Sequence, residues 1–135
     1  MCGIFGISST KPISNQLIKG LSKLEYRGYD SAGISGHDIN SKLVTIKATG
    51  PIKNLKHKLS KLKGITTAVS HTRWATHGQP TLKNTHPHLS EYIGIVHNGI
   101  IENYLDLKLY LKKKGYVFSS DTDCLLYTSP SPRDV

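Results

Sequence analysis

Hydrophobic and polar positions alternate in short blocks along this chain, and the spacing within each block indicates the local structure. Residues 2–8 form an apolar run with glycines and a polar boundary, which is typical of a buried strand. A polar turn separates residues 32–39 from 42–49, so we expect these two segments to pair as a hairpin. The pattern predicts strands at residues 2–8, 32–39, 42–49, 66–71, 92–97 and 116–118.

Three other segments carry apolar residues at helical spacing. The first has Ser14 or Asn15 as its expected N-cap, and Gly64 and Gly115 are expected to end the second and third. The predicted helices cover about residues 14–25, 52–63 and 102–114.

Neighbouring strands that pair, with helices in two sets, predict an α+β layered domain and not a doubly wound parallel sheet. The long polar stretch 73–90 predicts a functional or mobile loop.

Length and composition favour one compact domain. The chain has 135 residues, of which 37% are hydrophobic and 20% are charged, which is enough apolar surface for a core. No apolar run reaches the roughly 18 residues that span a bilayer, and the N-terminus lacks the order of a secretory signal. We therefore expect a soluble, cytoplasmic protein without a membrane partner.

The net charge of +9 raises the alternative of a basic nucleic-acid-binding module. Lysine supplies 15 of the 18 basic residues, many on predicted helix surfaces such as residues 52–63. Sequence-specific nucleic-acid binding relies on arginine and exposed aromatic residues, whereas scattered lysine gives salt-sensitive, unspecific attraction. We expect no nucleic-acid partner.

Composition changes abruptly after Asp123. Residues 124–135 contain no lysine and carry Pro130 and Pro132 close together. This run resembles an in-frame translation of a transposon adapter used in sequencing libraries, so we interpret it as a non-native tail and exclude it from the fold. The alternative is a natural Ser/Pro-rich linker.

Cys2 is the first candidate for chemistry. If Met1 is removed, the chain begins with a thiol next to a free α-amine. A thiol has a pKa of about 8.5 and an α-amine one of about 7.7 to 8.0, so the amine is a suitable base for the sulfur. An N-terminal nucleophile therefore carries its own base. The alternative is a small buried cysteine in a strand.

Four clusters, followed by Thr122 and Asp123, resemble successive motifs of the isomerising glutamine:fructose-6-phosphate aminotransferase family. These are CGIFG at 2–6, YRGYDSAG at 26–33, HTRWATHG at 71–78 and HNGIIEN at 97–103. The resemblance implies an N-terminal nucleophile (Ntn) hydrolase fold, an αββα sandwich of antiparallel sheets. It also implies that residues 1–123 are the N-terminal part of a class II glutamine amidotransferase domain, of this family or of another in that class.

The resemblance assigns a role to each matching residue. Cys2 would attack the side-chain amide of L-glutamine and form a thioester, while the Asn98 amide and the Gly99 N–H would hold the oxyanion. Arg73 would bind the α-carboxylate and Asp123 the α-ammonium of glutamine. The resemblance also implies a loop that closes over glutamine, containing Trp74, Thr76 and His77, with Arg27 in a motif that supports the loop. From residue type alone, the alternative for Asn98-Gly99 is an ordinary strand-end turn, and a core position for Trp74 is as open as a functional one.

Five histidines raise a metal site as an alternative, above all His86 and His88, which flank Pro87. None of the recognised zinc spacings occurs, so we expect no metal and no cofactor. A papain-like Cys-His pair is a further alternative, but residue 2 has no upstream chain for the helix that usually activates such a cysteine.

The resemblance places this chain in an enzyme that makes glucosamine 6-phosphate from fructose 6-phosphate and glutamine. Ammonia would pass to a C-terminal isomerase region that these 135 residues do not include. In the full-length enzyme the resemblance implies a homodimer. We expect the 135-residue fragment itself to be inactive and poorly stable, because missing strands leave sheet edges exposed. Asp121 stands where many members have Glu.

Overall fold

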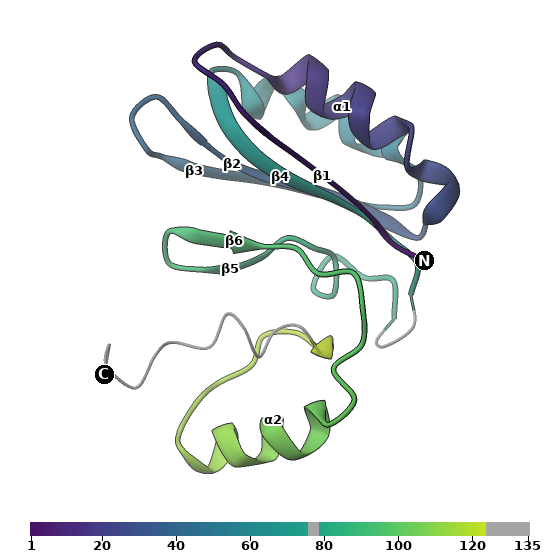
Figure 1. Cartoon of the computed structure of the whole chain (residues 1–135), viewed down its shortest axis with the longest axis vertical. Helices are drawn as coiled ribbons and strands as arrows, with labels where there is room; N and C mark the ends of the chain where they lie inside the picture. Colours follow the sequence, from purple (N-terminus) through teal and green to yellow (C-terminus); the bar gives the residue numbers. More distant parts are fainter. Residues whose placement is uncertain (76–78, 124–135) are drawn as a thin grey trace.

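A computed structural model describes residues 1–75 and 79–123 of the chain (Figure 1). The predicted tail at 124–135, and Thr76 and His77, lie outside the described residues. The elements follow in this order: β1 (Gly3–Ser8), α1 (Ser14–Ser22), η1 (Glu25–Arg27), β2 (Ser31–Asp38), β3 (Leu43–Thr49), η2 (Ile52–Leu62), β4 (Ile65–Arg73), β5 (His88–Ser90), β6 (Ile93–Ile95) and α2 (Tyr104–Lys113). Here η1 and η2 are 3-10 helices.

A four-stranded antiparallel sheet forms the centre of the fold, in the order β1-β4-β2-β3. The predicted hairpin is confirmed as β2 and β3. The register pairs Gly3 of β1 and Ala32 of β2 with Thr72 of β4. Because β4 lies between β1 and β2, its last residue, Arg73, is placed beside the start of the chain.

One face of this sheet is apolar and is covered by α1 and η2 (Figure 1). The spacing of the buried leucines in α1, Leu17 and Leu21, gives that helix a single apolar side. The buried residues of η2 are Ile52, Leu55 and Leu62. Strand residues such as Ile34 complete the same core.

The second sheet is the β5–β6 hairpin, which lies on the opposite side of the central sheet from α1 (Figure 1). It contacts β2: an added Cβ at Gly94 would lie 2.9 Å from Ser35 Oγ, and His37 Nε2 donates to the Tyr92 carbonyl at 3.0 Å. Helix α2 lies beyond the hairpin (Figure 1). The order helix, sheet, sheet, helix confirms the predicted α+β class and αββα layering. No helix in the described part of the chain is long and apolar enough to cross a membrane.

The predicted N-cap of the first helix is wrong. Ser14 lies inside α1, the N-cap is Ile13, and no side chain caps the helix. Ile13 is buried in the core, and its N–H donates to the Ile65 carbonyl of β4 at 2.9 Å. A tertiary contact therefore fixes the start of α1 in place of a local cap.

Three further expectations need correction. Residues 116–118 form no strand: the Tyr116 N–H instead donates to the Leu111 carbonyl of α2 at 3.1 Å. The segment 52–63 folds as the 3-10 helix η2, although it ends before Gly64 as predicted, with a φ of 86° there. The polar stretch 73–90 is not all loop, because it contains the end of β4 and the whole of β5.

Replacing Leu55 with Ala should destabilise the domain by about 2 to 5 kcal/mol, because a fully buried side chain would leave a cavity. Urea denaturation followed by circular dichroism measures the change. Lys56→Ala is the matched control, since Lys56 is exposed on the next position of η2. An equal effect of the two substitutions would contradict the assigned core.

Candidate active site

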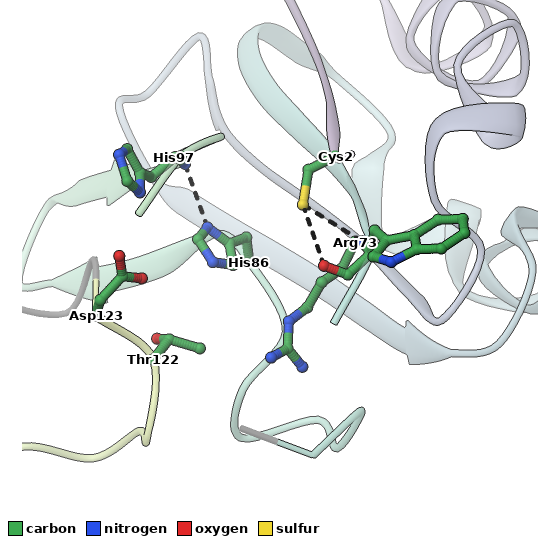
Figure 2. Close-up of a pocket in the computed structure, with 8 residues that line it drawn as sticks. Cys2, Arg73, His86, His97, Thr122 and Asp123 are labelled. Atoms are coloured by element: carbon green, nitrogen blue, oxygen red, sulfur yellow. Dashed lines mark hydrogen bonds between the residues drawn. The ribbon is translucent and has the colours of Figure 1, made fainter. Parts of the chain in front are cut away.

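The thiol of Cys2 lies at the start of β1, directly beside the end of β4. Its Sγ accepts the Trp74 N–H at 3.3 Å and lies 3.6 Å from the Trp74 carbonyl (Figure 2). The neighbouring Gly3 N–H donates to Thr72 Oγ1 at 3.1 Å, which fixes this end of the strand. Cys2 is half-buried, so its sulfur is held by the protein and still accessible.

Two side chains from distant segments meet on the Cys2 carbonyl. Arg27 Nε and Asn98 Nδ2 each donate to it at 3.0 Å. Asn98 is 96 positions away in sequence, so this contact brings the predicted oxyanion residue next to the predicted nucleophile. An amide nitrogen carries two hydrogens, and the second N–H of Asn98 is the one that could serve an oxyanion.

The motif at residues 27–30 supports the segment that follows β4. An added Cβ at Gly28 would lie 2.6 Å from the Arg73 backbone, so only glycine permits this approach. Asp30 accepts the Ala75 N–H on Oδ2 at 2.8 Å, and its own N–H donates to the Arg73 carbonyl at 3.1 Å. Arg27 lies in this motif: its guanidinium binds Cys2, and the residues after it hold residues 73–75.

Trp74 is not a core residue, because 46% of it is exposed. Its ring packs edge-on against Tyr29, with the ring centroids 6.1 Å apart and the planes at 71°. The contact places the indole beside the cysteine and leaves much of its surface open to a ligand.

A small cavity brings most of the predicted site residues together (Figure 2). Arg73 Nη1 donates to the Gln79 carbonyl at 2.9 Å, and Asp123 Oδ2 accepts the Ile101 N–H at 2.6 Å. One cationic and one anionic side chain thus share a cavity with a thiol. Its lining residues are Cys2, Arg73, Trp74, His86, His97, Gly99, Thr122 and Asp123.

The cavity has a volume of about 20 Å³, which holds on the order of one water molecule. A ligand as large as an amino acid therefore requires side chains or neighbouring segments to move. Residues 76–78, which contain Thr76 and His77 of the predicted loop, adjoin Ala75 and lie outside the described part of the chain. The other predicted site residues, Arg27 and Asn98, contact Cys2 and do not line the cavity.

Three buried imidazoles lie against the site. The His71 and His86 rings stack with centroids 4.1 Å apart and planes at 12°, and His86 lies 4.5 Å from His88. Burial lowers the pKa of His71 and His88 to about 4 and lowers the pKa of His86 further, with help from neighbouring positive charges. All three rings are therefore neutral at pH 7. No group of three His, Cys, Asp or Glu side chains within the described ranges is arranged to hold a metal ion.

Asn84 is a structural residue of the site that the sequence reasoning missed. It is 1% exposed, and its Nδ2 donates at 3.1 Å to the Gln79 carbonyl that also binds Arg73. Its Oδ1 accepts the Asp121 N–H at 2.9 Å and the Ser120 hydroxyl at 3.1 Å. Asn84 thus ties the support of Arg73 to the segment that leads to Asp123. The only signal in the sequence was its place in the long polar stretch.

Comparison with known proteins gives one consistent result. No protein-family model matches the chain. Three curated relatives are all named glutamine–fructose-6-phosphate aminotransferase (isomerizing), and each alignment covers 91% of this chain. They come from Buchnera aphidicola subsp. Baizongia pistaciae (51% identical, 20% of the relative covered), Francisella tularensis subsp. tularensis (51%, 20%) and Clostridium acetobutylicum (50%, 21%). The chain thus spans about a fifth of the length of these relatives.

Two solved structures share the fold. The glutamine phosphoribosylpyrophosphate amidotransferase from B. subtilis, complexed with ADP and GMP, matches with a TM-score of 0.80 and 29% identity. A structure described as the allosteric regulatory enzyme of purine biosynthesis matches with a TM-score of 0.83 and 31% identity. Each match covers 93% of this chain and 28% of the other chain.

The layered fold, with a cysteine at residue 2 beside the end of the central strand, is the Ntn hydrolase fold that the solved glutamine phosphoribosylpyrophosphate amidotransferase shares. The curated relatives, which are about 50% identical to this chain, all carry the same name, and this agreement is more specific than the shared fold. Over 91% of its length the chain is about half identical to proteins named isomerising glutamine–fructose-6-phosphate aminotransferase, which is consistent with an N-terminal fragment of such a protein.

The buried histidines predict a loss of stability in mild acid. An unfolded histidine has a pKa near 6.5, above the folded pKa of about 4 for His71 and His88. Their contribution is complete above pH 6.5 and is lost as the pH falls toward 4, by roughly 3 kcal/mol per histidine. Urea denaturation between pH 7.5 and 4.5 measures this slope.

Two variants separate the buried from the exposed histidines. His88→Gln should reduce the slope, because glutamine keeps a polar group near Thr122 Oγ1, 2.7 Å from His88 Nε2, and does not titrate. His57→Gln is the matched control, since His57 is exposed on η2. A flat stability between pH 7.5 and 4.5 in the unmodified chain would contradict the neutral histidine stack.

Proposed function

We propose that this chain supplies the glutaminase activity of an isomerising glutamine–fructose-6-phosphate aminotransferase, with Cys2 as the nucleophile. The observation that carries the proposal is the convergence on Cys2: Asn98 and Arg27 bind its carbonyl, and Arg73 and Asp123 share a cavity with its thiol. The curated relatives carry this name, and their identity of about 50% exceeds the 29% to 31% identity to the two solved structures.

The reaction requires prior removal of Met1, because that cleavage frees the Cys2 amine. That amine takes the thiol proton, and the thiolate attacks the side-chain amide carbon of L-glutamine. The tetrahedral intermediate then collapses: the carbon–nitrogen bond breaks, the proton returns to the leaving nitrogen, and ammonia departs. Water attacks the resulting glutamyl thioester, releases glutamate and restores the thiol.

Asn98 and Gly99 stabilise the negative oxygen formed in each of these steps. A side-chain amide and a backbone N–H are suitable donors, and one such donor contributes roughly 3 to 4 kcal/mol to the transition state. The contact of Asn98 with the Cys2 carbonyl supports this role, since it keeps the amide within reach of the reacting carbon.

Arg73 and Asp123 select an α-amino acid. A planar guanidinium binds a carboxylate through two parallel hydrogen bonds, and a carboxylate binds an ammonium group. Trp74 lies at the side of the cavity, and with Thr76 and His77 we assign it to a loop that closes over glutamine and excludes water. Arg27 holds the nucleophile in place through its hydrogen bond to the Cys2 carbonyl.

The remaining assignments concern the full-length enzyme. The curated relatives are about five times as long as this chain. We assign residues 1–123 to the N-terminal part of the glutaminase domain. Ammonia then reaches fructose 6-phosphate in a C-terminal isomerase region and yields glucosamine 6-phosphate. We further assign the enzyme to the cytoplasm as a homodimer that uses neither a cofactor nor nucleic acid.

Cys2→Ser in the full-length enzyme should lower glutamine hydrolysis by on the order of 10³-fold or more, because a serine hydroxyl is a far weaker nucleophile here. Release of glutamate measures the rate. Equilibrium binding of glutamine to the same variant shows whether the cavity is intact. Normal turnover in the variant would remove Cys2 from the mechanism.

Arg73→Lys should raise the KM for glutamine by roughly 10- to 100-fold while the fold stays intact, because lysine does not form the paired hydrogen bonds. Saturation kinetics of glutamate release measure the change. Lys83→Arg is the control, since its side chain is 56% exposed and lies outside the cavity. Unchanged glutamine saturation in Arg73→Lys would argue against the carboxylate clamp.

A further inference from the structure

The backbone of His97 is held from two sides by buried histidines. His97 directly precedes Asn98. Its carbonyl lies 3.0 Å from His71 Nε2, and its N–H donates to His86 Nδ1 at 3.3 Å (Figure 2 shows the bond to His86). The two imidazoles stack on each other. Both hydrogen-bonding groups of one peptide position are therefore fixed by a single pair of rings.

These contacts determine where each imidazole carries its proton. A carbonyl only accepts, so His71 must carry its hydrogen on Nε2; an amide N–H only donates, so His86 Nδ1 must be bare. Burial lowers the pKa of both groups, which keeps His86 neutral and able to accept. Each ring can therefore make its hydrogen bond to the His97 backbone in only one tautomer.

A histidine would be an unfavourable residue at position 71 if its side chain only filled space in the core. It is fully buried, and its Nδ1 has no hydrogen-bond partner in the described part of the chain. A buried polar atom without a partner destabilises the fold, and an apolar side chain would fill the space without that cost. Such local violations concentrate at functional sites.

The histidines connect the oxyanion segment to the rigid part of the fold. Asn98 and Gly99 lie beyond β6 and before α2, in no helix or strand, and are exposed. His71 belongs to the central strand β4. The backbone of His86 lies so close to β2 that an added Cβ at Gly33 would collide with the His86 carbonyl oxygen. Besides the two rings, the contact of Asn98 with the Cys2 carbonyl and the hydrogen bond from the Ile101 N–H to Asp123 hold this segment.

We propose that His71 and His86 are positioning residues that clamp the His97 backbone and so set the oxyanion donors Asn98 and Gly99 at the distance the reaction needs. This inference rests on the proposed function. The clamp acts on the transition state and leaves glutamine binding through Arg73 and Asp123 unaffected. Its loss should therefore lower kcat and leave KM for glutamine nearly unchanged.

The test exchanges each histidine for both Asn and Gln in the full-length enzyme. The amide of Asn superposes on Nδ1 of a histidine, whereas that of Gln reaches the position of Nε2. At residue 86 the bonding atom is Nδ1, so His86→Asn should keep more activity than His86→Gln. At residue 71 it is Nε2, so His71→Gln should keep more than His71→Asn. Each mismatched variant should have a kcat about 10-fold or more below its matched partner, with KM within about 2-fold.

This crossed pattern separates a clamp from a packing role, because the same two amides are compared at both positions and the longer one is expected to be better at residue 71 and worse at residue 86. Equal kcat values for Asn and Gln at both positions, or changes confined to KM, would overturn the clamp. Wild-type enzyme and Cys2→Ser are measured in parallel. If the wild type releases no glutamate, or Cys2→Ser releases it normally, the proposed function fails and the clamp fails with it; if both behave as proposed, the four variants alone decide.

Discussion

The pairing of β1 with β4 is the constraint on which the site depends. Its register sets Gly3 opposite Thr72, and this alone brings the second residue of the chain to the residues that follow β4. A shift of one residue would turn the thiol to the other face of the sheet. Every other contact of Cys2, with Trp74, Arg27 and Asn98, is built on that placement.

The two faces of the central sheet carry different kinds of side chain. The face toward α1 and η2 carries the apolar core. On the other side lie buried polar groups, among them the histidine stack and the network around Asn84. Buried polar groups add little net stability even when they are satisfied, but they hold one arrangement of neighbouring segments in place. Stability thus comes from one face, and the geometry of the site from the other.

Much of this could be predicted from the sequence, and the failures have a common cause. Alternation and turn residues were enough for the β2–β3 hairpin, and the motifs were enough to nominate Cys2, Arg73 and Asn98. The start of α1 was missed because a core contact of Ile13 replaces a side-chain cap. The parts played by Asn84 and His71 depend on partners 36 and 26 positions away, which local patterns do not encode.

In the proposed mechanism, removal of Met1 presents the sulfur and the amine of Cys2 together to glutamine. Treating the full-length enzyme with an electrophilic glutamine analogue, followed by peptide mass spectrometry, tests it most directly. We expect a single adduct, on a Cys2 that has lost Met1, and protection of that residue by excess glutamine. An adduct on another residue, or full glutamine hydrolysis by protein that retains Met1, would contradict it.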